Sequence, residues 1–209
     1  MVFKNIISFG LLTFMMINNE PVFILVQRRE SIPYILFVTN RLHIIQPQLL
    51  ESQLDTMTNN EKASLLNNQS LRKDIDKYRH ILENKTENLL DWSFPKGKAK
   101  RREIGIEIAK REFEEETPFT SRHIKSISQD IQSYSVTGSD NKLYKYYFFP
   151  TELVINLKDI ANPKDLNLTI PHLTTETSNI GFFGINQITE HNFKKPLYEF
   201  IHKFYKENF

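Results

Sequence analysis

The stretch from Phe94 to Phe119 constrains this chain more than any other, because it ends in a helix with a crowded acidic end. Glu112, Glu115 and Glu116 fall within about 100° of one another around such a helix. Carboxylates are unfavourable at this end, where the helix already carries partial negative charge. With no lysine nearby, they repel one another unless a cation lies among them. The pattern predicts a site for Mg²⁺ or Mn²⁺, which prefer oxygen ligands. The alternative is a solvated, glutamate-rich helix end.

The composition limits which other kinds of site are possible. The 209 residues include no cysteine, which excludes disulfides, thiolate catalysis and cysteine-ligated zinc and fits a reducing compartment. A net charge of +2 is too small to indicate a nucleic-acid partner, so any basic site has to be local. The length fits one domain over residues 1–209 that is enlarged by an insertion.

The pattern of apolar residues predicts an α/β fold with a mixed sheet between helices. Strands are expected at 6–17, 22–27, 124–136, 143–149 and 180–185, with a turn at 18–21. The glycine-free segment 47–90 is predicted to be a helical insertion, in which Thr58 and Glu61 form a capping box. Leu197, Phe200, Ile201 and Phe204 have the spacing of an amphipathic helix near the end of the chain.

The N-terminal segment has two interpretations. An early Lys4 followed by an apolar run is typical of a signal peptide. However, Asn5, Ser8 and Thr13 interrupt the run, no cleavage pattern follows, and the run is too short to span a bilayer. We therefore predict a buried strand here and no membrane partner.

The spacing of residues that begins at Gly97 is similar to the Nudix box. The matching positions are Gly97, Glu103, Arg111, Glu112, Glu115 and Glu116. This motif marks hydrolases that act on nucleoside diphosphates linked to another moiety. One position departs from it, because Pro118 stands where the family has glycine. Proline cannot adopt the positive φ that glycine permits, but it can still end the helix.

The resemblance implies an α/β/α sandwich and assigns roles to residues of the box. Glu112, Glu115 and Glu116 would bind Mg²⁺ or Mn²⁺, and loop carbonyls near Lys96 and Gly97 would complete the coordination.

Other residues would support or share the chemistry. Glu103 would pair with Arg111 and brace the helix. Glu115 would accept the proton of the attacking water, and Glu176, outside the box, is the second candidate for this role.

More of the chain resembles one branch of the family, the mRNA-decapping and diphosphoinositol-polyphosphate hydrolases of large DNA viruses (African swine fever virus, giant-virus and poxvirus type). The matching stretches are "ILVQRR" (24–29), "MTNNEK" (57–62) and "WSFPKGK" (92–98). The branch implies mRNA decapping, which yields methylated GDP and RNA with a 5′-monophosphate. It also implies a cytoplasmic location, which would be the cytoplasm of the host cell if the protein is viral. One alternative is hydrolysis of diphosphoinositol polyphosphates. Another is an inactive Nudix-like binding module, but the intact glutamates argue against an inactive protein.

The partner would be capped RNA or another anionic pyrophosphate. Lys96, Lys98 and Arg28 are candidates to bind its phosphates. A methylated guanine is cationic, so Tyr34, Tyr144 or Tyr146 could stack on it, although the simpler interpretation of each is a core or surface tyrosine. Basic residues at 71–85 in the helical insertion could contact RNA phosphates or form a solvated face. The sequence does not define the oligomeric state.

Overall fold

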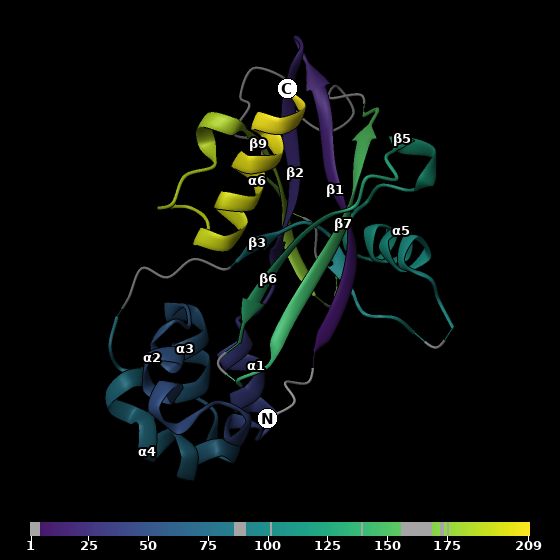
Figure 1. Cartoon of the computed structure of the whole chain (residues 1–209). Coiled ribbons are helices and arrows are strands. Elements are labelled where there is room, and N and C mark those ends of the chain that lie inside the picture. Colours follow the sequence, from purple (N-terminus) through teal and green to yellow (C-terminus); the bar gives the residue numbers. More distant parts are fainter. Residues whose placement is uncertain are drawn as a thin grey trace. The chain divides into compact units, whose positions relative to one another are not determined.

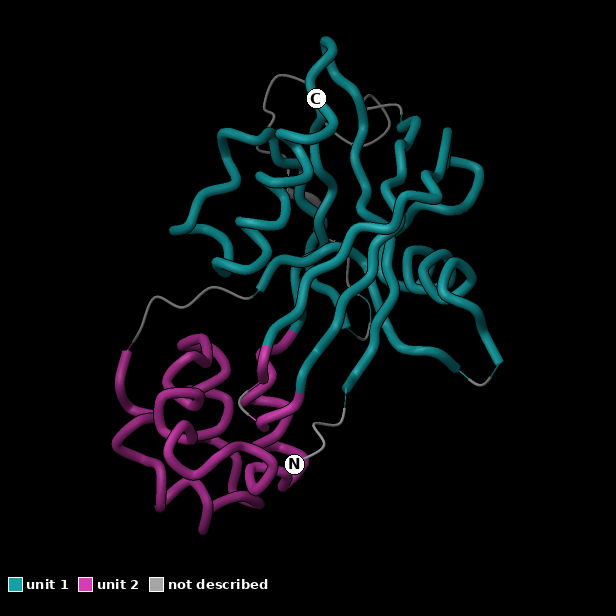
Figure 2. The backbone as a smooth tube through the Cα atoms, viewed as in Figure 1, with its two compact units in different colours: residues 1–29, 91–136, 143–209 teal, residues 30–90, 137–142 magenta. Residues whose placement is uncertain are grey.

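The computed structural model describes residues 5–85, 91–100, 102–138, 140–155, 169–171, 174 and 176–209. The chain divides into two compact units (Figure 2). One unit comprises residues 1–29, 91–136 and 143–209, and the other comprises residues 30–90 and 137–142. Each unit has buried apolar clusters of its own.

The first unit is built on a mixed sheet, as the sequence predicts. Its described strands are β1 (Ile6–Ile17), β2 (Glu20–Arg28), β3 (Trp92–Ser93), β4 (Lys96–Gly97), β5 (Ile124–Ile127), β6 (Gln132–Thr137), β7 (Leu143–Leu153), β8 (Thr169–Pro171) and β9 (Thr177–Gly184). The main order is β5-β7-β1-β2-β9-β8, while β3 pairs with β2, β4 with β1 and β6 with β7. β1 and β7 run parallel, and β1 is antiparallel to β2.

The β1–β2 hairpin follows from a two-residue turn. Asn18 and Asn19 have φ angles of 51° and 66°, and asparagine tolerates this left-handed conformation better than most residues. The turn sets Ile17 opposite Glu20 and so fixes the register of both strands. The predicted strand at 6–17 is confirmed, and the second strand is longer than predicted.

Two helices cover the two faces of the sheet (Figure 1). α5 (Gly105–Glu116) packs through Ala109 and Phe113 on a cluster that includes Leu11 of β1. α6 (Lys195–Asn208) packs on the cluster that contains the next residue, Leu12. Because neighbouring residues of a strand point to opposite faces, the arrangement is an α/β/α sandwich. The predicted fold class is therefore confirmed.

One predicted strand is wrong in its extent. The segment 124–136 forms two strands, β5 and β6, separated by residues 128–131. The backbone N–H of Asp130 donates to the Ser128 hydroxyl (3.0 Å), a local turn that competes with the strand ladder. The strand predicted at 143–149 continues through Pro150, whose carbonyl accepts from the Ser128 N–H (2.8 Å).

The second unit is helical. Its elements are α1 (Ile32–Val38), α2 (Leu50–Asp55), α3 (Asn59–Leu66) and α4 (Arg72–Leu82), with 3₁₀ turns η1 (Leu42–Ile44), η2 (Pro47–Leu49) and η3 (Gln69–Leu71). Phe37, Leu54, Met57, Leu65 and Tyr78 belong to its core. Helix begins at Ile32, well before residue 47, because Ser31 caps α1 and a proline stands in the first turn. The predicted capping box at the start of α3 is confirmed.

The Glu61 carboxylate links two helix starts in this unit. It accepts from the Thr58 N–H (2.8 Å) in the capping box and from the Ser31 N–H (2.6 Å) at the cap of α1.

None of the helices among the described residues is long and apolar enough to cross a membrane.

Candidate active site

The glutamates of α5 lie at its C-terminal end, beside an apolar face that packs on the sheet. The buried residues of that face are Ile108, Ala109 and Phe113. At helical spacing, the glutamates of the last turn lie next to this apolar face. The helix ends at Thr117, whose hydroxyl donates to the Phe113 carbonyl (2.6 Å) and whose backbone is extended, with φ −129°. The chain therefore leaves the helix without a left-handed residue, which explains how Pro118 replaces glycine here.

The Glu112 side chain lies directly against the backbone of Gly97. A Cβ atom added at Gly97 would lie 2.0 Å from the carboxyl carbon of Glu112 and 2.0 Å from its Oε1 atom. A side chain at residue 97 would force the Glu112 carboxylate to move away, so glycine permits this close approach. Gly97 pairs with Phe9 of β1, and the pairing holds the loop backbone against the carboxylate.

Glu116 is buried at the end of α5. Its Oε2 atom accepts from the Lys96 backbone N–H at 3.0 Å. Burial raises the pKa of Glu116 to about 7; the charge and N–H of Lys96 oppose the shift, and the nearby carboxylates of Glu112 and Glu176 add to it. The Thr177 hydroxyl donates to the Glu116 carbonyl (3.3 Å), which brings the start of β9 to this end of α5.

Glu115 is more exposed and is held by two cations. Lys100 Nζ lies 2.9 Å and 3.0 Å from its two oxygens, and Arg111 Nη1 lies 2.9 Å from Oε2. The hydrogen bond from Lys100 lowers the pKa of Glu115; burial opposes the shift, and the charges of Arg111 and Lys100 add to it. The interpretation that no lysine lies near these carboxylates is therefore wrong, because Lys100 reaches them from the preceding loop.

Arg111 connects the loop to the helix. Its Nε atom donates to Glu103 Oε1 (2.8 Å) and its Nη2 atom to Glu103 Oε2 (3.1 Å). Arg111 also donates to Glu112 Oε1 (2.6 Å) and to the Lys98 carbonyl (3.0 Å). With its contact to Glu115, the residue thus joins three glutamates and the loop backbone into one network.

We expect Glu103→Gln to lower the melting temperature at neutral pH and to make it less sensitive to acid. The hydrogen bonds from Arg111 lower the pKa of Glu103 below 4.5 in the folded protein. The stability from this ion pair is therefore present above pH 4.5 and is lost as the pH falls through the lowered pKa. Thermal melts from pH 7 to pH 3 test this. Melting curves of the variant and the wild type that stay equally far apart at every pH would contradict it.

Three of the predicted substrate residues lie together. Lys96 Nζ is 5.5 Å from the centre of the Tyr146 ring and 2.9 Å from Ser93 Oγ. Burial lowers the pKa of Lys96 to about 8; Glu116 opposes the shift, and the charge of Arg28 adds to it. Arg28 also acts on the phenol of Tyr146, so these two and Lys96 form one cationic and aromatic cluster.

The other predicted residues are placed as follows. Tyr144 is two residues from Tyr146 on β7 and so lies on the same face of the sheet. Lys98 is exposed in the loop, and Glu176 is exposed just before β9. Tyr34 belongs to the helical unit, where its hydroxyl lies 3.2 Å from Ser64 Oγ.

The sequence did not indicate that Asp91 and Ser93 would belong near this cluster. The charge of Asp91 acts on Lys96 and Tyr146, and its carboxylate pairs with Lys194. No motif spacing points to Asp91, whereas Ser93 lies within the matched stretch 92–98 and could have been considered with it.

The acidic end of α5 fits a divalent cation in its chemistry. Glu112 and Glu116 offer desolvated carboxylates, and their mutual repulsion is what a cation would relieve. Within the residues that the structure describes, no three acidic or histidine side chains already converge on one point. Arg111 and Lys100 instead occupy oxygens of Glu112 and Glu115, so a cation would have to replace some of these contacts.

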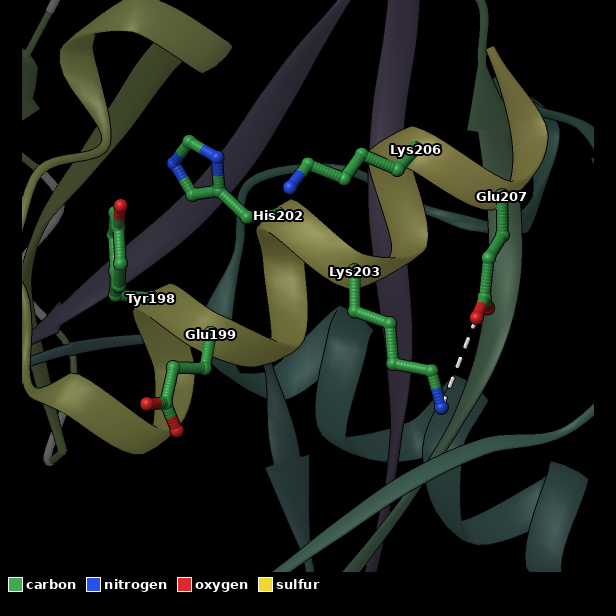
Figure 3. A pocket seen from close by; sticks show the side chains of 6 residues that line it. All are labelled: Tyr198, Glu199, His202, Lys203, Lys206 and Glu207. Atoms are coloured by element: carbon green, nitrogen blue, oxygen red, sulfur yellow. Dashed lines mark ion pairs between the residues drawn. The ribbon is translucent and has the colours of Figure 1, made fainter.

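A shallow hollow lies elsewhere, on the outer face of α6 (Figure 3). It is lined by Tyr198, Glu199, His202, Lys203, Lys206 and Glu207, and Lys203 pairs with Glu207 at 3.8 Å. None of the predicted site residues is among its lining residues. The hollow has no part in the arrangement described above.

Solved structures with the same fold are Nudix hydrolases. The chain is similar to the C. elegans Ap4A hydrolase binary complex, with 14% identity, coverage of 97% of this chain and 96% of that one, and a TM-score of 0.54. It is also similar to the MutT protein from Methanosarcina mazei Go1, with 16% identity, coverage of 100% and 98%, and a TM-score of 0.53. No family model and no curated protein sequence matches the chain. The chain therefore has the fold of Nudix hydrolases.

Proposed function

We propose that the protein is a metal-dependent pyrophosphohydrolase of the Nudix type. The observation that carries this proposal is the pair of buried carboxylates, Glu112 and Glu116, held against the backbone of Lys96 and Gly97. Burying carboxylates is costly even when they are paired, as Glu112 is with Arg111, and the similar solved structures are hydrolases. A pure binding module would have no need of them.

The proposed chemistry divides among the residues of the site. Mg²⁺ or Mn²⁺ would neutralise the pyrophosphate and orient a water for in-line attack on phosphorus. Glu112, Glu115 and Glu116 would hold the cation, with the carbonyls near Gly97. Glu115, which is more exposed, would accept the proton of the attacking water, and Glu176 is the second candidate.

Capped RNA is the substrate that we propose first. The resemblance to decapping enzymes in the stretches 24–29, 57–62 and 92–98 supports it. Tyr144 and Tyr34 are the candidates to stack on the methylated guanine. Tyr146 is a weaker candidate, because its ring already lies beside the Lys96 ammonium, which would repel a cationic base.

The helical unit offers fewer basic contacts for RNA than its sequence indicates. Arg79 of α4 pairs with Asp76 (2.7 Å) and Glu83 (3.6 Å), and Arg72 also approaches Asp76. An RNA contact would therefore depend on the lysines of this segment, Lys73, Lys77 and Lys85.

Diphosphoinositol polyphosphates are the second candidate, and one observation favours them. Lys96 lies beside the Tyr146 ring, and the charge of Arg28 acts on both, so the two basic residues form a compact cationic cluster. A small, highly anionic substrate needs such a cluster and does not need an aromatic cage or a long basic surface.

The test compares substrates side by side with the full chain and Mg²⁺ or Mn²⁺. The substrates are cap-labelled RNA, a diphosphoinositol polyphosphate and Ap4A, and a chelator provides the blank. Release of methylated GDP supports decapping, and release of inorganic phosphate from the inositol compound alone supports the second candidate. Turnover of Ap4A alone would contradict both substrates while supporting the reaction class. Equal turnover with the chelator would overturn the role of the metal.

A further inference from the structure

The Lys100 side chain lies on a carboxylate that the proposed function assigns to a metal ion, so the inference rests on that function. Its Nζ atom is within 3.0 Å of both Glu115 oxygens. One ammonium group thus contacts both oxygens of the carboxylate. We propose that Lys100 competes with the divalent cation for Glu115 and sets the cation concentration at which the site fills.

The position of Lys100 is prepared by other residues of the network. Its backbone N–H donates to Glu103 Oε2 at 2.7 Å, and Arg111 holds Glu103. Arg111 also binds the carbonyl of Lys98, so the loop is fixed on both sides of residue 99. A fixed backbone reduces the entropy lost when the Lys100 side chain is ordered, which favours its contact with Glu115.

The two cations on Glu115 are not equivalent. Arg111 Nη1 reaches Oε2 and extends to Glu112, whereas Lys100 is the group that also covers Oε1. An ammonium and a metal ion cannot occupy the same oxygen lone pair. A cation that binds Oε1 therefore either displaces Lys100 or uses the remaining lone pair beside the ammonium charge, which repels it. In both cases the ion pair with Lys100 lowers the apparent affinity of Glu115 for the cation.

The expected effect is measurable but limited. The side chains of Lys100 and Glu115 are 62% and 48% exposed, so water and salt screen the pair. The strength measured for exposed pairs corresponds to a change of up to about fivefold in a dissociation constant. Lys100 therefore tunes the binding of the cation and does not block it.

The experiment measures Mn²⁺ binding to the full chain without substrate, by electron paramagnetic resonance of the free ion. Lys100→Met is expected to lower the dissociation constant by about two- to fivefold. Lys100→Arg restores a cation and should return it close to the wild-type value. Lys110→Met is the matched control, because it removes one charge from the exposed side of α5, near Glu114.

Each outcome bears on one of the two proposals. An unchanged or higher dissociation constant in Lys100→Met would overturn the competition, as would an equal decrease in Lys110→Met. Mn²⁺ binding that is insensitive to Glu115→Gln would overturn the assignment of that ligand. A wild-type chain that binds no Mn²⁺ would overturn the proposed function itself, whatever the lysine variants do.

Discussion

Glu115→Gln is expected to lower the turnover number by about 10²- to 10⁴-fold, the range for loss of a positioned general base. The amide keeps the shape of the side chain but cannot accept the proton and binds a divalent cation weakly. Stability should change little, because Glu115 is half-exposed and its ion pairs are screened. The measurement is the initial rate of hydrolysis under saturating metal, alongside a thermal melt.

Glu114→Gln is the matched control for this substitution. Glu114 is the preceding residue of α5, but its carboxylate accepts from the Ser121 N–H (2.8 Å) and hydroxyl (2.6 Å), away from Lys100 and Arg111. We expect nearly wild-type turnover in this variant. A comparable loss in Glu114→Gln would show that the acidic helix end acts only through its total charge. Retained turnover in Glu115→Gln would show that Glu115 is not the general base.

Much of this arrangement is predictable because it depends on spacing along one element. The faces of α5 follow from helical periodicity, which separates the apolar stripe of Ala109 and Phe113 from the glutamates. The β1–β2 hairpin follows from an asparagine turn between two apolar runs. In both cases the signal lies within about a dozen residues, where local geometry determines which side chains share a face.

The contacts that could not be predicted join separate elements. Periodicity says that Glu115 is on one face of α5, but not that the loop before the helix returns Lys100 to it. The sequence likewise gives no sign that Asp91 acts on Lys96 and Tyr146. Helix α1 is a run of seven apolar and aromatic residues, and periodicity does not distinguish a short buried helix from a strand in such a run. Such features depend on packing rather than on local preference.

Gly97→Ala is expected to displace the Glu112 carboxylate from the loop and so to disrupt the site. The added Cβ would lie 2.0 Å from the Glu112 carboxylate, so either the loop or the side chain has to move. Forced repacking of this kind costs about 1–3 kcal/mol of unfolding free energy. A displacement of about 1 Å in a catalytic group can cost on the order of 10²-fold in rate, and Mn²⁺ binding should weaken with it.

Gly184→Ala provides the control for the loss of a glycine. A Cβ there would be 3.7 Å from the nearest side-chain atom, Gln187 Oε1, and the φ angle of −68° suits alanine. We expect its stability and activity to remain close to those of the wild type. If Gly184→Ala lost as much stability and activity as Gly97→Ala, the effect would come from replacing any glycine and not from the contact with Glu112.

The double variant Gly97→Ala/Glu112→Ala tests whether the collision with Glu112 is the cause. If it is, truncating Glu112 should cost less stability in the Gly97→Ala background than in the wild type, with a coupling of about 0.5–3 kcal/mol. Activity should remain lost, because the carboxylate itself is gone. Additive effects on the unfolding free energy would show that the two residues do not meet. Gly97 would then be needed for its carbonyl or for the loop path, and not as the space into which Glu112 fits.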